Sequence, residues 1–252
     1  MSSTLTKSLF SIVFALILSL PSWSQSEEWS HRPSKFYAST GGEMIFSWAS
    51  TTHPTSNEGA VLRWAPVFNF QTLMNYDLGR AFGFTGGIAI RNQGYIYDFN
   101  DVDGSQLQFK KKFRTYNLGL PVGIKIGNMD GYHVFGGYEF ELPFHYKEKT
   151  FDTDGSQIDK FNTWFSDRQQ KTMHTFFAGL QMKGGTQIKF KYYLTEFHNR
   201  DFTTTTNDNY PPSGDPNQPY KGLTSNVFYI ALAWNINKNN YRHYKSQWSD
   251  WD

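Results

Sequence analysis

The sequence predicts an all-β membrane protein: a closed, antiparallel, eight-stranded transmembrane β-barrel with short periplasmic turns and long extracellular loops. Three observations support this prediction. Eight segments alternate between apolar and polar residues, the connections between them are short and long in strict turn, and aromatic residues make up 18% of the chain. Such an aromatic content is typical of a barrel whose lipid-facing surface carries two interfacial belts.

The clearest alternation runs from Tyr116 to Ile126. Every even position in this segment is apolar, and the odd positions hold Asn, Gly, Pro and Lys. The same parity returns from Tyr132 to Tyr146 after a short turn. A strict period of two indicates β-strands with one apolar and one polar face. The two segments therefore predict a β-hairpin.

Six further segments show the same pattern. Apolar residues gather on even positions in Met44–Trp48, Leu62–Tyr76, Phe82–Ile90, Phe176–Met182, Ile188–Leu194 and Phe228–Ile236. After Ile90 the apolar positions change to odd, at Tyr95 and Tyr97. We expect a β-bulge near Gly94, because one extra residue in a strand exchanges its two faces.

The connections indicate how the barrel sits in the membrane. Those at 79–81, 127–131 and 183–185 are short and contain glycine, whereas those at 50–61, 99–110, 148–171 and 198–222 are long and polar. In bacterial outer-membrane barrels, short turns face the periplasm and long loops face the outside. The sequence therefore predicts a protein of the cell outer membrane with both termini in the periplasm.

The two ends of the chain differ from the barrel in composition. Lys7, the apolar run 9–20 and the small residues around Trp23 predict a signal peptide that is cleaved near Ser24. This apolar run is too short to span a bilayer as a helix. The predicted organisation is a signal peptide at 1–24, a periplasmic segment at 25–41, the barrel at 42–237 and a periplasmic tail at 238–252.

Alternation alone does not say which face points outward, because a soluble lipocalin-like barrel would place its apolar face inside. Residue size decides between the two. The even face is crowded with Phe, Tyr, Leu and Ile, and the odd face is rich in Gly and Ala. An eight-stranded barrel leaves room only for packed side chains in its interior. We therefore expect the odd face inside and the even face against outer-membrane lipid.

Charged residues on the odd face should then lie in the lumen. They are Arg63, Arg91, Lys125, Glu139, Glu141, Lys189 and Lys191. Buried charges must be paired or hydrogen-bonded, so we expect a salt-bridge network that plugs the barrel. A proton or ion path is the alternative, and the narrow interior argues against it.

Several classes of function have little support. A net charge of +2 does not indicate nucleic-acid binding, and the absence of cysteine excludes a disulfide scaffold. No two histidines share a strand face at ligand spacing, so we expect no metal site and no cofactor. Asp101 and Asp103 in one loop, and Asp152 and Asp154 in another, precede glycines. Such pairs can bind Ca²⁺ or simply form tight turns, and we favour turns.

An enzyme that modifies lipid A would need a serine activated by a histidine, with a carboxylate, at the outer rim. His174 with Ser166 and Asp167, or His145 with Glu141, could be arranged in this way. No spacing in the sequence requires either arrangement. We therefore predict that the protein is not an enzyme.

A barrel with a packed lumen must act through its loops, its lipid face or its tails. The third and fourth long loops carry aromatic residues among polar neighbours. These residues are Phe161, Trp164, Phe165, Tyr210 and Tyr220. We expect them to form an outer patch that binds a partner, or alternatively to pack together and cap the barrel. Trp248 and Trp251 in the tail are the second candidate for partner binding.

Three sequence motifs resemble the PorT-like outer-membrane β-barrel proteins. They are Leu62-Arg63-Trp64-Ala65-Pro66 with Asn69, Phe84-Thr85-Gly86-Gly87 leading to residues 91–98, and residues 116–125. The resemblance spans roughly residues 40–237. It implies a barrel associated with type IX secretion, which scaffolds or assists a secretion or envelope complex. A lipid A-modifying hydrolase or acyltransferase is the alternative function.

Overall fold

The computed structural model describes residues 35–52, 60–99, 108–205, 208 and 210–236. Apart from one short 3-10 turn, Lys183–Gly185, its regular elements are all strands. The strands are β1 (Lys35–Thr52), β2 (Ala60–Val61), β3 (Arg63–Ala65), β4 (Phe70–Leu78), β5 (Phe82–Phe99), β6 (Phe109–Gly127), β7 (His133–Phe151), β8 (Gln157–Trp164), β9 (Met173–Gln181), β10 (Thr186–Tyr193) and β11 (Thr224–Ile236). The predicted signal peptide and the tail with Trp248 and Trp251 lie outside the described residues.

Eight of these strands close into a ring. The order is β1, β4, β5, β6, β7, β9, β10 and β11, and all neighbours pair antiparallel. The ring closes between β1 and β11, which pair continuously from Thr40 with Ile236 to Thr52 with Thr224. Closure leaves no unpaired strand edge within the ring, as a barrel in lipid requires. The predicted closed eight-stranded barrel is confirmed.

The outward face of the barrel is apolar over the length of a membrane span. On β6 the side chains of Leu118, Leu120, Val122, Ile124 and Ile126 are 41 to 56% exposed. A belt of this kind around the whole ring is stable against lipid and not against water. The chain is therefore a transmembrane barrel, and the lipocalin-like alternative is wrong. Within the described ranges, no helix is long and apolar enough to cross a bilayer.

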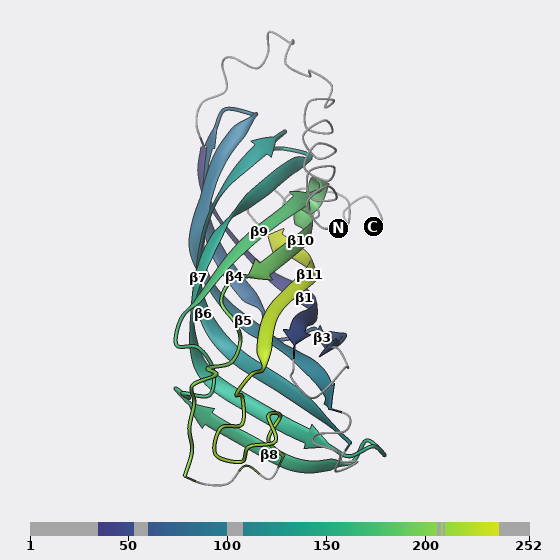
Figure 1. Cartoon of the computed structure of the whole chain (residues 1–252). Helices are drawn as coiled ribbons and strands as arrows, with labels where there is room; N and C mark the ends of the chain where they lie inside the picture. The colour runs from purple at the N-terminus through teal and green to yellow at the C-terminus, as the bar shows by residue number, and fades with distance from the viewer. Residues whose placement is uncertain (1–34, 53–59, 100–107, 206–207, 209, 237–252) are drawn as a thin grey trace, which may run out of the picture. The chain divides into compact units, whose positions relative to one another are not determined.

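Beyond the membrane the two faces of the long strands exchange their chemistry. Outward positions of β6 change from Leu118 and Tyr116 to Arg114 and Lys112, while the inward Phe113 is fully buried. Strands β5, β6 and β7 continue past the ends of β9 and β10 (Figure 1). This extension has the pattern of a soluble protein, with charges outside and aromatic rings inside. The exchange marks the outer boundary of the membrane-spanning part.

The exchange explains why the bulge expected near Gly94 is wrong. β5 and β6 pair without any register shift, and Tyr95 and Tyr97 point inward into the aromatic interior. Gly94 has a φ of +154°, and a Cβ at this position would lie 2.1 Å from the carbonyl oxygen of Phe113. The glycine therefore permits a close approach of two strands and adds no residue to β5.

The register shift lies in β7. Asn117 pairs with Pro143, and Tyr116 pairs with His145, so Phe144 is the extra residue. After it, the inward face passes from odd to even positions. Tyr146 is fully buried and is not part of an interfacial belt, whereas His145 points outward and not into the lumen. Both residues were expected on the opposite face.

Strand ends also differ from the predicted ones. Residues 35–41, expected in a periplasmic segment, belong to β1 and pair with β4. The predicted second strand is interrupted around Phe68, whose φ is +63°. There the side chain of Asn69 replaces strand pairing, donating to the Ala65 carbonyl and accepting from the backbone N–H of Asn92. The third loop contains a hairpin, because β8 pairs with the extension of β7.

Candidate functional site

Three acidic and three basic side chains meet in the middle of the lumen. They are Glu43, Arg91, Glu139, Glu141, Lys189 and Lys191, and all are buried. The Arg91 guanidinium donates to Glu139 at 2.9 Å, to Glu43 at 2.8 Å and to Gln71 at 2.9 Å. Lys189 pairs with Glu43, and Lys191 pairs with both Glu139 and Glu141. Three positive and three negative charges leave this central cluster without net charge.

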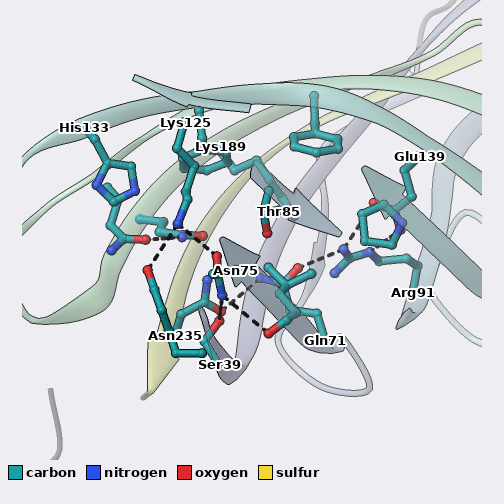
Figure 2. Close-up of a pocket in the computed structure, with 17 residues that line it drawn as sticks. Ser39, Gln71, Asn75, Thr85, Arg91, Lys125, His133, Glu139, Lys189 and Asn235 are labelled. Atoms are coloured by element: carbon teal, nitrogen blue, oxygen red, sulfur yellow. Dashed lines mark hydrogen bonds and ion pairs between the residues drawn. The ribbon is translucent and has the colours of Figure 1, made fainter. Parts of the chain in front are cut away.

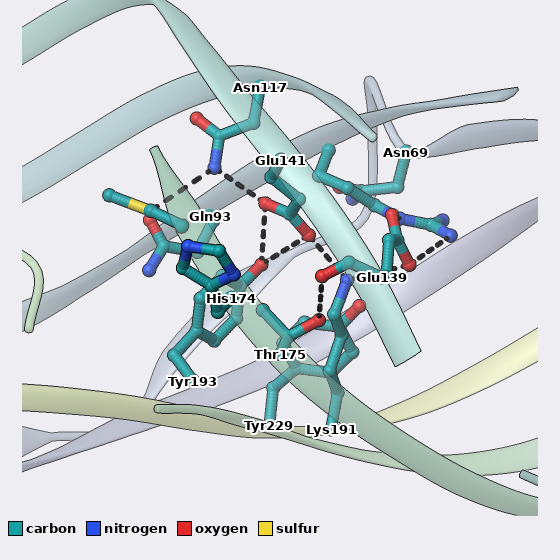
Figure 3. A network of polar contacts seen from close by, with 12 residues as sticks. Asn69, Gln93, Asn117, Glu139, Glu141, His174, Thr175, Lys191, Tyr193 and Tyr229 are labelled. Atoms are coloured by element: carbon teal, nitrogen blue, oxygen red, sulfur yellow. Dashed lines mark hydrogen bonds and ion pairs between the residues drawn. The ribbon is translucent and has the colours of Figure 1, made fainter. Parts of the chain in front are cut away.

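Neutral donors complete the coordination of the carboxylates. Figure 3 shows Tyr193 and Asn117 directed at Glu141, to which they donate at 2.9 and 2.6 Å. Tyr229 donates to the second oxygen of Glu43 at 3.5 Å. Side chains from β1, β4, β5, β6, β7, β10 and β11 thus meet across the lumen. Side chains from these seven strands fill the cross-section of the lumen at this level.

A small polar cavity lies towards the short-turn end of the lumen. Lys125 occupies its wall and donates to Asp77 at 2.5 Å, to Asn75 at 3.1 Å and to Tyr37 at 3.1 Å. Figure 2 shows Lys125, Asn75 and His133 around the cavity, whose volume is about 40 Å³. A polar space of this size holds a few water molecules. The cavity therefore resembles a hydrated pocket of the plug and not a ligand site.

The seven charged residues expected in the lumen are all buried, and six of them pair with opposite charges. Arg63 differs, because its guanidinium donates to the carbonyl and side-chain oxygens of Asn92. Sequence reasoning missed Glu43, which lies one residue before the predicted start of its strand. It also missed Lys111 and Glu148, which fall at or beyond the predicted ends of their strands. Glu43 and Lys111 are at odd positions, and Glu148 is at an even position after the register shift at Phe144. Longer predicted strands, with that shift included, would have placed all three inside.

A second cluster of charges lies outside the membrane, inside the strand extension. Glu148 pairs with Lys111, and its other oxygen accepts from Tyr146 and Tyr220 at 2.8 Å each. Arg168 donates to Tyr220 at 2.9 Å and lies 3.1 Å from Asp208. The described part of the fourth loop, including Tyr220, folds over this end of the barrel.

His198 lies at the centre of the aromatic packing under the fourth loop. Its ring stacks on Tyr220 with centroids 4.3 Å apart and meets the edge of Phe113 at 4.5 Å. Its Nε2 is 2.9 Å from the hydroxyl of Tyr95. Burial, followed by the nearby charges of Lys111 and Arg168, lowers the pKa of His198 well below its ordinary value. His198 is therefore neutral in the folded protein.

This histidine predicts that acid loosens the fourth loop. In the unfolded loop the His198 imidazole takes up a proton below about pH 6.5, whereas in the folded protein it stays neutral. The contribution of His198 to the free energy of loop closure is therefore complete above that pH and is lost as the pH falls. We expect a loss of up to about 1.4 kcal/mol for each pH unit below it. Hydrogen–deuterium exchange of residues 194–223 at pH 7.5 and pH 5 measures the effect. In His198→Phe, which keeps a flat ring but takes no proton, the pH dependence should disappear; its persistence would contradict the assignment.

The five loop aromatic residues of the expected partner patch differ in exposure and in their contacts. Tyr220 is fully buried, so its expected role as a surface contact is wrong. Phe161 faces Arg168, whose guanidinium lies 4.5 Å from its ring, and Tyr210 packs against the ring of Phe109. Tyr220 and Tyr210 thus pack inside the outer end of the barrel, whereas Phe161 stays 37% exposed. Trp164 and Phe165 remain exposed, by 64 and 76%.

Each residue considered for catalysis has other partners. The His174 ring contacts the Tyr138 hydroxyl on the outward face. The Ser166 hydroxyl accepts from the backbone of Arg168, and Asp167 pairs with Lys171. Glu141 lies inside the lumen and His145 outside it, so the arrangement of these two residues that the sequence left possible is not formed.

The aspartates of the third loop close the β7–β8 hairpin. Asp152 accepts from the backbone N–H of Thr153, and Asp154 from that of Ser156. Their carboxylates thus serve the turn, which Gly155 completes with a φ of +84°. Among the described residues, no three His, Cys, Asp or Glu side chains gather as a metal site. Asp101 and Asp103 lie outside the described residues.

Several solved structures share a distant structural likeness with this chain. No protein-family model and no curated protein matches the sequence. The attachment invasion locus protein Ail of Yersinia pestis is 11% identical, with 79% of this chain and 99% of that one covered and a TM-score of 0.33. Neisserial surface protein A is 9% identical over 81% and 99%, with a TM-score of 0.35. OprG of Pseudomonas aeruginosa is 8% identical over 80% and 95%, with a TM-score of 0.31.

The strand pairing and the apolar belt define the fold. A closed barrel with an even number of strands, short turns at one end and long loops at the other is the architecture of bacterial outer-membrane proteins. The chain has the fold of an outer-membrane β-barrel protein. The PorT-like resemblance stays a prediction.

Proposed function

We propose that this barrel is a non-enzymatic docking protein that scaffolds or assists a secretion or envelope complex through its β7–β8 hairpin. The lumen is filled by paired charges, so the chemistry available for recognition lies at the surface. The PorT-like resemblance favours a component of a protein secretion machinery as the partner.

The unpaired edge of β8 is the observation that carries this proposal. Among the described residues, β8 pairs only with β7, so its other edge presents free backbone N–H and C=O groups. Such an edge can pair with an extended segment of another protein. The exposed rings of Trp164 and Phe165 lie at the end of the same strand. Aromatic side chains are the commonest anchors in protein interfaces, which makes this hairpin suited to docking.

A double substitution tests the proposal. Trp164→Ser/Phe165→Ser should weaken binding of a partner recovered in mild detergent by about thirtyfold, because an aromatic anchor contributes about 2 kcal/mol. The barrel should still show heat-modifiable migration in gels. Phe36→Ser, which removes an aromatic side chain that is 65% exposed at the other end of the barrel, is the control. Equal recovery of the partner with both variants would refute docking at the hairpin.

A further inference from the structure

The outward surface of the strand extension carries a dense group of positive charges. On β6, Arg114 and Lys112 lie beyond Tyr116 towards the long-loop end, and on β7 Lys147 and Lys149 lie beyond Phe144 in the same direction. We call these four cations the outer basic face. Further along the same outward faces, on the membrane side, lie the exposed apolar residues Leu118 of β6 and Leu142 of β7. The four cations therefore occupy the first polar layer beyond the membrane.

The strand register places like charges directly opposite each other. Arg114 pairs with Lys147, and Lys112 pairs with Lys149, which in turn lies opposite Lys160 of β8. Like charges in such positions destabilise a sheet. Among the described residues, none of these five cations forms an ion pair with a carboxylate; the nearby Lys110 does, with Asp98 at 3.3 Å. An anion between the strands would remove this repulsion.

The electrostatics of the single groups agree with this interpretation. Burial, followed by the charges of Arg63, Arg114 and Lys149, lowers the pKa of Lys112. Burial and then the charges of Arg114, Lys160 and Lys149 lower the pKa of Lys147. Each of these lysines therefore gains from a bound anion that offsets its positive neighbours.

The four cations surround a shallow pocket of about 230 Å³, which Phe151 also lines. Aromatic rings hold two of the cations in place: the Arg114 guanidinium lies 5.1 Å from the Tyr116 ring, and the Lys149 ammonium lies 6.0 Å from the Phe151 ring. The pocket is wide enough for a phosphate group, and arginine binds phosphate with two parallel hydrogen bonds.

The position of the outer basic face relative to the membrane suggests which molecule would supply the phosphate. The rings of Phe68, Tyr116 and Phe144 form a row on the outward face, with neighbouring centroids 5.9 and 6.4 Å apart. Rows of aromatic residues mark the headgroup level of a membrane. The outer basic face begins directly beyond this row, where the phosphates of an outer-leaflet glycolipid lie. We propose that Lys112, Arg114, Lys147 and Lys149 bind a phosphate of the lipid A headgroup.

Binding of two forms of lipid A to the full-length barrel in detergent tests this proposal. Native mass spectrometry would compare bisphosphorylated lipid A with lipid A from which the phosphates have been removed. The unaltered protein should bind the phosphorylated form at least about tenfold more tightly, since the phosphate accepts charge-assisted hydrogen bonds that the dephosphorylated form cannot. Changing all four residues of the outer basic face to Gln should abolish this preference.

The control changes four exposed cations elsewhere, Lys171, Lys183, Arg200 and Lys221, to Gln and should keep the preference. Heat-modifiable migration verifies that both variants fold. A preference that survives in the first variant, or is absent from the unaltered protein, would overturn the site. Inorganic phosphate at the same concentration should not displace lipid A, and if it binds as tightly, the assignment to a lipid is wrong.

Discussion

The Arg91→Met variant is expected to lose about 3–5 kcal/mol of stability, a large effect for a single substitution in this barrel. Arg91 is fully buried and donates to Glu43, Glu139 and Gln71. Its removal leaves three buried carboxylates with two buried cations, Lys189 and Lys191. An uncompensated charge in a water-excluded lumen is far more costly than the loss of a surface pair. The urea midpoint for unfolding from lipid vesicles, read by heat-modifiable migration, measures the loss.

Two further variants show whether charge balance is the cause. Arg200→Met removes an arginine whose side chain is 49% exposed and pairs with Glu196 on the surface, so it should cost less than about 1 kcal/mol. Combining Arg91→Met with Glu139→Gln restores equal numbers of charges and should recover part of the lost stability. Equal midpoints for Arg91→Met and Arg200→Met would contradict a charge-balanced plug.

The membrane-spanning part of the fold could be predicted because the bilayer imposes one rule on it. Most outward residues there are apolar, so parity alone assigns Leu118 to lipid and Arg91 to the lumen. Beyond the membrane the rule reverses. In the sequence, the apolar residues Tyr95 and Tyr97 at odd positions then suggest that the strand has exchanged its two faces, although β5 continues to pair with β6 in the same register. The real irregularity at Phe144 escaped detection because no glycine marks it.

The charged lumen could be predicted as a set of residues but not as a set of pairs. Parity places Arg91 and Glu139 on inward faces, yet their contact depends on how β5 and β7, which are not neighbours in the ring, are staggered. Loop residues do not follow the period-two alternation, so their sequence does not indicate which of them are buried. In the sequence, Tyr220 and Phe165 both look like exposed loop aromatics. In the structure Tyr220 is buried under the fourth loop, whereas Phe165, in the third loop, is 76% exposed.

The Phe197→Ala variant should open the fourth loop and leave the membrane-spanning barrel folded. Phe197 is fully buried among Tyr95, Phe113 and Tyr146, with ring centroids 5.5 to 6.4 Å away. Removing a buried phenylalanine costs about 3–5 kcal/mol. This aromatic packing lies beyond the membrane, whereas the central cluster and the ring of strands hold the spanning part. The loss should therefore appear as local opening.

Proteolysis of the barrel in vesicles and hydrogen–deuterium exchange of residues 194–223 would detect that opening, with heat-modifiable migration as the measure of the barrel itself. Phe165→Ala is the matched control, because a ring that is 76% exposed should contribute less than about 0.5 kcal/mol. If Phe197→Ala abolished heat-modifiable migration, the outer aromatic packing and the membrane-spanning ring would form one cooperative unit. Cleavage confined to the loop, with migration unchanged, would mean that the two parts unfold separately and that the loop can open while the plugged barrel stays in the membrane.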